Sequence, residues 1–277
     1  MFQIIKLDTM QMSILRELIY NPLRVDRMGL LKLYFTKEFV NTCRVRDVDI
    51  RIGVKSSLEL FRCETYQTKE PETLDWIDEF KENEILFDIG GNIGVYSMYA
   101  GKKGARVFAF EPESQNFSRL VNNASLNGLT NMMPYCLGLG QKSEFSFLNI
   151  TSFNAGDSQH QVAGEDLLYE RSFEKVKQGC VVFSLNDLCF VHGLPVPNHI
   201  KIDVDGLEPE IILGADKVLK HPNVKTVLIE INKGDNSKYD IQQFIESLGF
   251  DLLGVSKREF RTEKVVARNY IFKKKPL

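Results

Sequence analysis

The chain has 277 residues, of which 43% are hydrophobic and 26% are charged. Such a composition is typical of a folded protein with a sizeable core, and it excludes a chain that is disordered throughout. Lys and Arg number 35 against 37 Asp and Glu, which gives a formal net charge of -2. Because no net positive field favours a polyanion, we do not expect nucleic acid as a partner.

The positions of cysteine and histidine favour neither a disulfide framework nor a zinc site. The five cysteines are odd in number and scattered, and the four histidines show no HxxxH or Cys/His pairing. The amino terminus has no signal-peptide core, and no run of the roughly 18 apolar residues of a membrane span occurs. We therefore expect a cytoplasmic protein with reduced thiols and no membrane span.

Residues 1–71 are expected to form an N-terminal accessory segment. Apolar residues with helical spacing between residues 10 and 42 predict two short helices. From residue 48 to residue 54, apolar residues alternate with polar residues or glycine, which predicts a strand with one wet face. We expect this segment to pack on the main domain or to cover its cleft.

Residues 72–277 are expected to form one α/β domain, because apolar segments alternate with helical patterns after a first amphipathic helix at 72–81. The predicted strands are 85–90, 106–112, 133–139, 199–205, 224–231, 251–256 and 269–274, and the predicted helices are 93–101, 114–127, 208–220 and 240–248. Residues 151–179 are polar and break this alternation, so we interpret them as an inserted loop or lid. The predicted fold is a doubly wound, mostly parallel seven-stranded sheet.

The most informative segment is FDIGGNIG at residues 87–94, in which a buried strand ends in an acid and a glycine-rich turn leads into a helix. Glycines let the backbone approach a ligand closely, and the carboxylate of Asp88 can face an ammonium or sulfonium group. Glu111 ends the next predicted strand, where an acid can accept hydrogen bonds from both ribose hydroxyls. Together these acids fit an adenosine that carries a positively charged tail.

Two other interpretations of the glycine-rich turn are weaker. A nicotinamide or flavin dehydrogenase needs G-x-G-x-x-G, whereas the turn here reads G-G-N-x-G, and Asp88 would place a negative charge beside the pyrophosphate. Alternatively, the glycines only turn the chain. The presence of both Asp88 and Glu111 at strand ends favours the cofactor site.

Several segments in the correct order resemble the FkbM-type methyltransferases, which use S-adenosylmethionine to O-methylate sugars and other hydroxyl-bearing metabolites. The resemblance covers about residues 72–256 and is carried by FDIGGNIG (87–94), FAFEP (108–112), NASLNGL (123–129), SLNDL (184–188), KIDVDGLE (201–208) and LIEI (228–231). The family usually has Glu at the position of Asp205 and Asp at that of Asn186. The resemblance implies a class I methyltransferase, Rossmann-like fold.

The resemblance also implies a set of cofactor-binding residues, namely Asp88, Gly90, Asn92, Gly94, Glu111 and Leu137. Asp88 and Gly90 are expected at the methionine end of the cofactor, and Glu111 at the ribose. The residues at 92 and 94 are expected to shape the turn. Leu137, or its neighbour Gly138, is expected to border the adenine.

The catalytic residues are expected after the fourth predicted strand, beside the cofactor strand, where open α/β sheets place their crevice. A hydroxyl is a poor nucleophile, so a base that removes its proton typically contributes ~10²–10⁴-fold. We predict Asp203 as this base. For Asp205 and Gly206, the alternative is that they start the following helix as caps. Glu230 lies in an apolar run and is expected to face the cleft and help bind substrate.

Asp203, Asp205 and Glu230 are also an alternative set of oxygen ligands for Mg²⁺. Acids on adjacent strand ends do not by themselves make a metal site, so we do not favour a resident metal.

We therefore predict an S-adenosylmethionine-dependent O-methyltransferase that acts on a hydroxyl of a sugar, glycan or small metabolite. One alternative is a non-catalytic module that binds S-adenosylmethionine or a nucleotide, which the retention of both cofactor acids disfavours. Another is a nucleic-acid methyltransferase, which needs a basic, aromatic-lined approach that the net charge disfavours. The sequence leaves the identity of the acceptor and the oligomeric state open.

Overall fold

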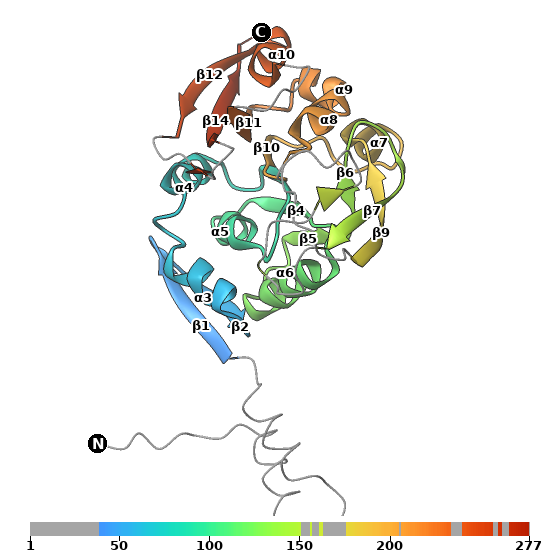
Figure 1. Cartoon of the computed structure of the whole chain (residues 1–277). Coiled ribbons are helices and arrows are strands. Elements are labelled where there is room, and N and C mark those ends of the chain that lie inside the picture. The colour runs from blue at the N-terminus through green and yellow to red at the C-terminus, as the bar shows by residue number, and fades with distance from the viewer. Residues whose placement is uncertain are drawn as a thin grey trace, which may run out of the picture. The chain divides into compact units, whose positions relative to one another are not determined.

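The computed structural model describes residues 39–150, 156, 161–162, 176–204, 206–233, 240–256, 260–261 and 266–276. Residues 41–277 form one compact unit (Figure 1). The helices predicted between residues 10 and 38, Asp205 and most of the predicted loop at 151–179 lie outside the described residues.

The described strands are β1 (Phe39–Val45), β2 (Val48–Val54), β3 (Ile85–Ile89), β4 (Arg106–Phe110), β5 (Met132–Tyr135), β6 (Gly138–Leu139), β7 (Glu144–Ile150), β8 (Gln161–Val162), β9 (Val176–Phe183), β10 (His199–Ile202), β11 (Thr226–Lys233), β12 (Phe250–Val255), β13 (Phe260–Arg261) and β14 (Val266–Lys274). The described helices are α3 (Ser57–Glu64), α4 (Pro71–Asp78), α5 (Val95–Lys102), α6 (Ser114–Leu126), α7 (Leu185–Phe190), α8 (Glu208–Leu213), α9 (Asp216–Lys220) and α10 (Ile241–Ser247).

The central sheet has the strand order β12-β14-β11-β10-β3-β4-β5, and β13 pairs with β14. Strands β11, β10, β3, β4 and β5 run parallel, whereas β14 is antiparallel to both β11 and β12. The predicted mostly parallel, doubly wound sheet is therefore confirmed. From β3 the chain continues to β4 on one side, while β10 lies on the other side, so the carboxyl ends of β3 and β10 border the crevice of this fold.

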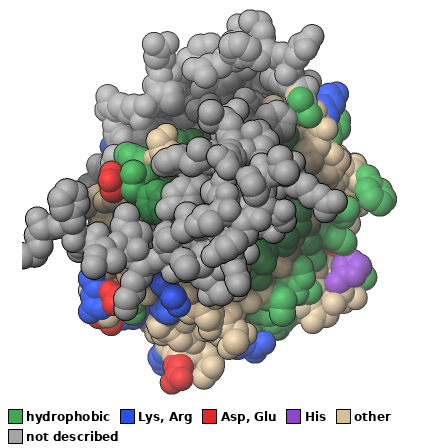
Figure 2. Space-filling view, turned by 90° about the horizontal axis from the view of Figure 1, so that it is seen from below, with side chains coloured by type: hydrophobic (Ala, Val, Ile, Leu, Met, Phe, Trp, Pro, Cys, Tyr) green, Lys and Arg blue, Asp and Glu red, His purple; other side chains and the backbone are tan. Residues whose placement is uncertain are grey.

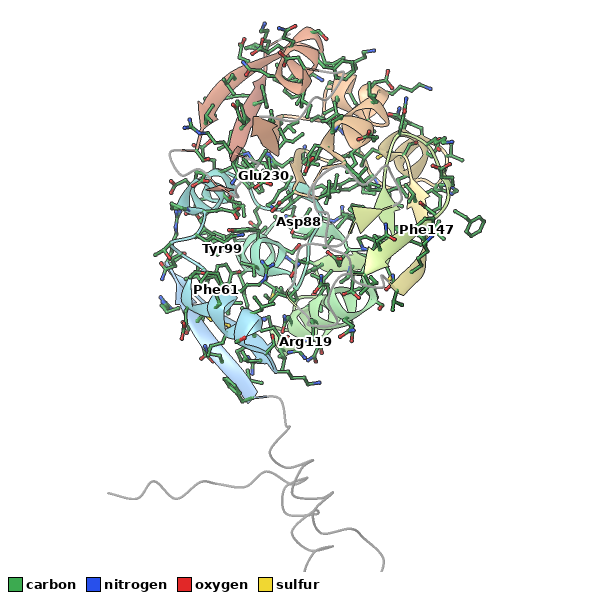
Figure 3. All side chains as sticks on the ribbon, in the orientation of Figure 1. Phe61, Asp88, Tyr99, Arg119, Phe147 and Glu230 are labelled. Carbon is green, nitrogen blue, oxygen red and sulfur yellow. The ribbon has the colours of Figure 1, made fainter. Side chains whose placement is uncertain are left out.

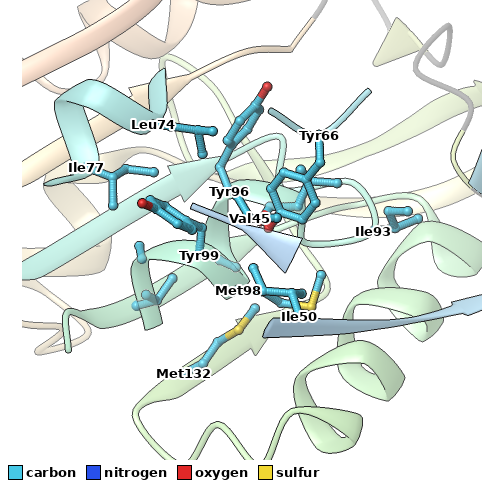
Figure 4. Packing of buried hydrophobic residues seen from close by; sticks show 14 of the residues in the cluster. Val45, Ile50, Tyr66, Leu74, Ile77, Ile93, Tyr96, Met98, Tyr99 and Met132 are labelled. Atoms are coloured by element: carbon cyan, nitrogen blue, oxygen red, sulfur yellow. Dashed lines mark hydrogen bonds between the residues drawn. The ribbon is translucent and has the colours of Figure 1, made fainter. Parts of the chain in front are cut away.

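The two faces of the sheet bury different residues because side chains alternate along each strand. In β3, Leu86 belongs to a core cluster that includes side chains of α4, α5 and α6, and Figure 4 shows part of this cluster. The next residue, Phe87, belongs to a second cluster with side chains of α7, α8, α9 and α10. Asp88 therefore points to the same side as Leu86, toward α5.

The accessory residues 41–71 share the first of these clusters. Side-chain amides at the end of α6 extend the hydrogen bonding of β2: Gly53 N donates to Asn123 Oδ1 and Arg51 N donates to Asn127 Oδ1, each at 2.9 Å. These bonds satisfy backbone groups that would otherwise be buried without partners. The accessory strand is thus part of the same compact unit as the main sheet.

A buried ion pair connects α3 to α6. The side chain of Arg119 is labelled in Figure 3. Its Nε donates to Glu59 Oε1 at 2.5 Å, and both side chains are buried. The other oxygen of Glu59 accepts the backbone N–H of Ser56, while Ser56 Oγ accepts the N–H of Glu59, which is a capping box. The carboxylate therefore starts its own helix and also fixes that helix to α6.

Some predicted boundaries were wrong. Residues 39–42, predicted as helix, belong to β1, because pairing with β2 outweighs the local helical spacing. The strand predicted at 133–139 is divided into β5 and β6, which join different sheets. The helix predicted at 208–220 is two helices, because Gly214 packs on the backbone of Gly140, where a Cβ would stand 2.2 Å from the carbonyl oxygen.

A second sheet with the order β6-β9-β7-β8 was not predicted. Residues 176–179, placed in the predicted inserted loop, belong to its strand β9. Its inner face buries Leu148 and Val182, but its outer face carries the 90% exposed Phe145. Because apolar residues occupy both faces, the sequence shows no clean alternation there.

A polar network is buried at the amino-terminal ends of β10 and β11. Trp76 Nε1 donates to Thr226 Oγ1 at 2.8 Å, and His199 contacts Thr226 Oγ1 through Nδ1 at 2.7 Å and Glu84 Oε2 through Nε2 at 2.8 Å. The imidazole stacks on Phe80, with ring centroids 3.7 Å apart. Burial lowers the pKa of His199 to about 4 despite the hydrogen bond with Glu84. The ring is therefore neutral at pH 7, with Nε2–H donating to the carboxylate.

Acidification should destabilise the protein through His199. Its ordinary pKa is 6.5, so between pH 6.5 and about 4 the unfolded chain binds a proton that the folded chain does not. The free energy of unfolding should fall over this range by up to about 3 kcal/mol. Urea unfolding across this range should show a flatter pH dependence for His199→Gln, whereas the exposed control His192→Gln should keep the wild-type dependence. Equal slopes in both variants would contradict the assignment.

Candidate active site

Backbone hydrogen bonds fix both sides of the turn between β3 and α5. Gly90 N and Gly91 N both donate to Phe110 O of β4 at 3.0 Å, and Asp203 N, just past β10, donates to Ile89 O at 3.1 Å. Gly90 has a φ of +80°, and a Cβ there would stand 1.9 Å from the carbonyl oxygen of Asp203. The missing side chain of Gly90 therefore lets the carboxyl ends of β3 and β10 meet.

Asn92 and Gly94 determine the path of the same turn. Gly94, with a φ of +92°, is the N-cap of α5, and a Cβ there would stand 2.6 Å from Leu120 Cδ1. Asn92 has a φ of +50°, and its Oδ1 accepts the N–H of Ile93 at 2.9 Å, which supports this left-handed conformation.

Asp88 is buried near the centre of the sheet (Figure 3). Its Oδ2 accepts the hydroxyl of Ser97 at 2.5 Å, whereas Oδ1 accepts no hydrogen bond from the described residues and lies 3.9 Å from Lys201 Nζ. Burial raises the pKa of Asp88, and the charge of Lys201 limits that rise. A buried carboxylate oxygen without a hydrogen bond is costly, so Oδ1 favours a further cationic donor.

Glu111 is buried just past β4, and both its oxygens accept backbone N–H groups. Oε2 accepts Asn92 N at 2.8 Å and Oε1 accepts Glu113 N at 3.0 Å. These bonds orient the carboxylate and leave a lone pair on each oxygen for another donor. Burial raises the pKa of Glu111 to about 7, although the two backbone hydrogen bonds oppose that rise.

Asp203 forms an ion pair with a buried lysine of its own strand. Lys201 Nζ donates to Asp203 Oδ2 at 2.8 Å, and the Lys201 side chain is 2% exposed, whereas that of Asp203 is 29% exposed. Burial alone would raise the pKa of Asp203, but the charges of Lys201 and Lys69 lower it below its ordinary value. Asp203 is therefore ionised at neutral pH and reaches the surface of the site.

A further group of polar residues lies beside this ion pair. Glu70 is buried at the start of α4, pairs with Lys69 at 3.0 Å and accepts Asn269 Nδ2 of β14 at 3.4 Å. Tyr96 of α5 lies close enough to Glu70 to be affected by its charge, and its ring centroid lies 5.2 Å from Lys201 Nζ. Burial and the charge of Glu70 raise the pKa of Tyr96 well above its ordinary value, so its hydroxyl stays protonated.

The sequence reasoning missed Lys201, Glu70 and Tyr96. Strand periodicity could have indicated Lys201, because residue 203, one position past β10, continues the alternation and shares the face of residue 201. Glu70 and Tyr96 come from a helix start and a helix interior whose positions against the sheet no local pattern specifies.

The two remaining predicted site residues lie at the same edge of the sheet. Glu230 of β11, labelled in Figure 3, directly follows Ile229, which pairs with Ile202 of β10. Leu137 is half-buried between β5 and β6 and packs on the second core cluster. Their roles toward acceptor and adenine stay predictions.

Among the residues that the structure describes, no group of three or more His, Cys, Asp or Glu side chains is arranged to hold a metal ion. Asp205 lies outside those residues. The Mg²⁺ alternative with Asp203, Asp205 and Glu230 therefore stays untested.

The residues around the turn fit S-adenosylmethionine. Asp88 Oδ1 offers a buried acceptor to an ammonium group, and Glu111 offers lone pairs to two ribose hydroxyls.

Comparison with known proteins identifies the family of the chain. Residues 88–252 match the family described as the methyltransferase FkbM domain. The protein belongs to the FkbM methyltransferase family. It is 30% identical over 189 residues to the hexuronic acid methyltransferase AglP of Haloferax volcanii, which covers 68% of this chain and 72% of that protein. It is also 27% identical over 191 residues to Methyltransferase 1 of Beauveria bassiana, covering 62% and 74% of the two chains.

The solved structures that are similar to this chain include an rRNA methylase from Streptococcus thermophilus. The two chains are 12% identical with a TM-score of 0.45, and the match covers 73% of this chain and 94% of that one. Membership of the FkbM family makes the protein a methyltransferase that uses S-adenosylmethionine as its cofactor.

Gly90→Ala should reduce stability and cofactor binding more than the backbone strain of an alanine at positive φ does by itself. The added Cβ must displace the Asp203 carbonyl, which should cost about 1–3 kcal/mol of stability and weaken S-adenosylmethionine binding. Gly249 has a φ of +90° with nothing within 4 Å of its Cβ position, so Gly249→Ala is the matched control for strain alone. Urea unfolding and calorimetry should show a larger loss for Gly90→Ala; equal losses would contradict the close approach.

Glu111 should make cofactor binding depend on pH. Because its pKa is raised to about 7 and the ionised form accepts hydroxyl hydrogen bonds better, affinity should weaken by up to about tenfold per pH unit below pH 7. Calorimetry with Glu111→Gln should show weaker binding at about pH 8 and loss of this dependence. Glu208, whose pKa burial also raises to about 7, supplies the control: Glu208→Gln should keep the dependence. If both variants keep it, Glu111 does not bind the ribose.

Proposed function

We propose that the protein transfers the methyl group of S-adenosylmethionine to a hydroxyl of a sugar, glycan or small metabolite, which it orients with Asp203. The observation that carries this proposal is the position of Asp203. Its carboxylate lies at the carboxyl end of the strand beside the cofactor strand, and it is 29% exposed where its buried neighbours Asp88 and Lys201 are 2% exposed. Of these three charged side chains, Asp203 is therefore the most accessible to an acceptor.

The chemistry suits an oxygen nucleophile. S-adenosylmethionine, when bound, supplies an electrophilic methyl group, and the acceptor hydroxyl must lose its proton as it attacks. Asp203 is ionised at neutral pH because Lys201 lowers its pKa, so it can accept the hydroxyl hydrogen bond and then the proton. Holding the hydroxyl in line with the methyl group should supply much of the rate.

A sugar-like acceptor is supported by the relative AglP, which is named a hexuronic acid methyltransferase. A sugar carries several hydroxyls, so its binding site needs several side chains that can form hydrogen bonds with them. Glu230 and Asp203 follow paired positions of neighbouring strands, and we propose that Glu230 helps bind the acceptor.

A nucleic-acid acceptor has little support from the described charges. Where Figure 2 shows described residues, their Lys and Arg side chains lie singly or beside Asp and Glu. We therefore keep a small-molecule or glycan acceptor as the proposal.

We further propose that the reaction takes place in the cytoplasm. All five cysteines lie within the described residues and are free thiols, which suits a reducing compartment. Within the described residues, no helix has the length and apolar character needed to cross a membrane.

Replacement of Asp203 tests the acceptor role. Asp203→Asn keeps the size and one oxygen but removes the basicity, so turnover at saturating S-adenosylmethionine should fall by ~10²–10⁴-fold while the cofactor still binds measurably. Mass spectrometry of a panel of glycosides and hexuronates, incubated with the purified chain and S-adenosylmethionine, identifies the acceptor and measures the rate.

The exposed acid of β12 provides the matched control, because Asp251→Asn should keep wild-type turnover. Melting temperatures of both variants separate a folding defect from a catalytic one. A folded Asp203→Asn variant with near wild-type turnover would show that Asp203 is not the base and would make Glu230 the next candidate.

A further inference from the structure

Lys201 is a charged side chain with almost no access to water. It lies in β10 directly beside Asp88 of β3 in the parallel register, and 2% of its side chain is exposed. Burial would lower the pKa of Lys201, but the charges of Asp203, Asp88 and Glu70 raise it, so the side chain is an ammonium. A buried ammonium is tolerated only where carboxylates compensate for the lost hydration.

The lysine lies between two carboxylates that face different parts of the site. Its Nζ is 2.8 Å from Asp203 Oδ2, on the acceptor side, and 3.9 Å from Asp88 Oδ1, on the cofactor side. The ring of Tyr96 covers the ammonium from a third side, with its centroid 5.2 Å from Nζ. Lys201 is therefore enclosed by residues of this chain, and a direct contact with the acceptor does not fit its exposure.

The charges of this cluster complement the methyl donor. Asp88, Asp203 and Lys201 together carry one excess negative charge. S-adenosylmethionine carries one net positive charge, because of its sulfonium, whereas its product S-adenosylhomocysteine is neutral overall. Three further charged residues lie nearby. Glu70 and Lys69 form an ion pair, and Arg62 donates to Gly156 O. Substitution of Lys201 or Asp203 leaves these outer charges unchanged.

We propose that Lys201 is a positioning residue, the shared counterion of Asp88 and Asp203, whose charge sets how strongly the site prefers the sulfonium donor to the neutral product. With the lysine present, one excess negative charge favours the donor while still permitting release of the product. Without it, two uncompensated carboxylates should hold a cation more strongly and release of the donor should slow. The inference rests on the assignment of the cofactor to Asp88.

The test is the ratio of the dissociation constants of S-adenosylhomocysteine and S-adenosylmethionine, measured by calorimetry on the full chain. The two ligands differ by one methyl group and one charge, so a general loss of structure weakens both and leaves the ratio unchanged. The variants are Lys201→Met, Asp203→Asn and the two combined. Lys142→Met, at a side chain that is 75% exposed, is the matched control for loss of a lysine.

The ratio should rise by about tenfold in Lys201→Met and fall by about tenfold in Asp203→Asn, a change that corresponds to about 1.4 kcal/mol. In the combined variant the cluster regains its original net charge, so the ratio should return close to that of the wild type. Lys142→Met should leave the ratio unchanged.

If Lys201→Met does not fold, the decision rests on the comparison of Asp203→Asn with the combined variant, in which the lysine is removed without leaving Asp203 charged. A ratio that is the same in those two variants overturns the inference, as does an unchanged ratio in folded Lys201→Met. A wild-type chain that binds neither ligand would overturn the cofactor assignment itself, and the inference with it.

Discussion

The close contact between the backbones of Gly90 and Asp203 is the constraint on which the site depends. Because a Cβ at Gly90 would stand 1.9 Å from the Asp203 carbonyl oxygen, the carboxyl ends of β3 and β10 can meet only with glycine there. The register between these strands places Lys201 beside Asp88, and the alternation of side chains places Asp203 on the same face. The groups that we expect to contact cofactor and acceptor thereby come within one polar cluster.

Keeping that cluster buried requires support from outside the sheet. Tyr96 and Ser97 of α5 cover it on one side, and Glu70 at the start of α4 adds a further carboxylate. The accessory strand β2 and helix α3 hold α6, and with it the side chain of Leu120 that packs against Gly94. The segment before the main sheet therefore contributes to the geometry of the turn that is expected to bind the cofactor.

The arrangement separates two functions by exposure. The carboxylates expected to hold the cofactor, Asp88 and Glu111, are buried and oriented by hydrogen bonds from their own chain. Asp203 is more exposed and ionised, which suits contact with an acceptor that enters from solvent.

The sequence by itself determined the parallel sheet, the glycine-rich turn and the acids at the ends of β3 and β4, because strand periodicity and turn chemistry are local. Resemblance of the same segments to a family supplied the cofactor. Only the tertiary structure decided that Lys201 is shared by Asp88 and Asp203, that Glu70 and Tyr96 border them, and that β7 and β9 form a second sheet. These features depend on strand register and on contacts between distant segments, which no local pattern encodes.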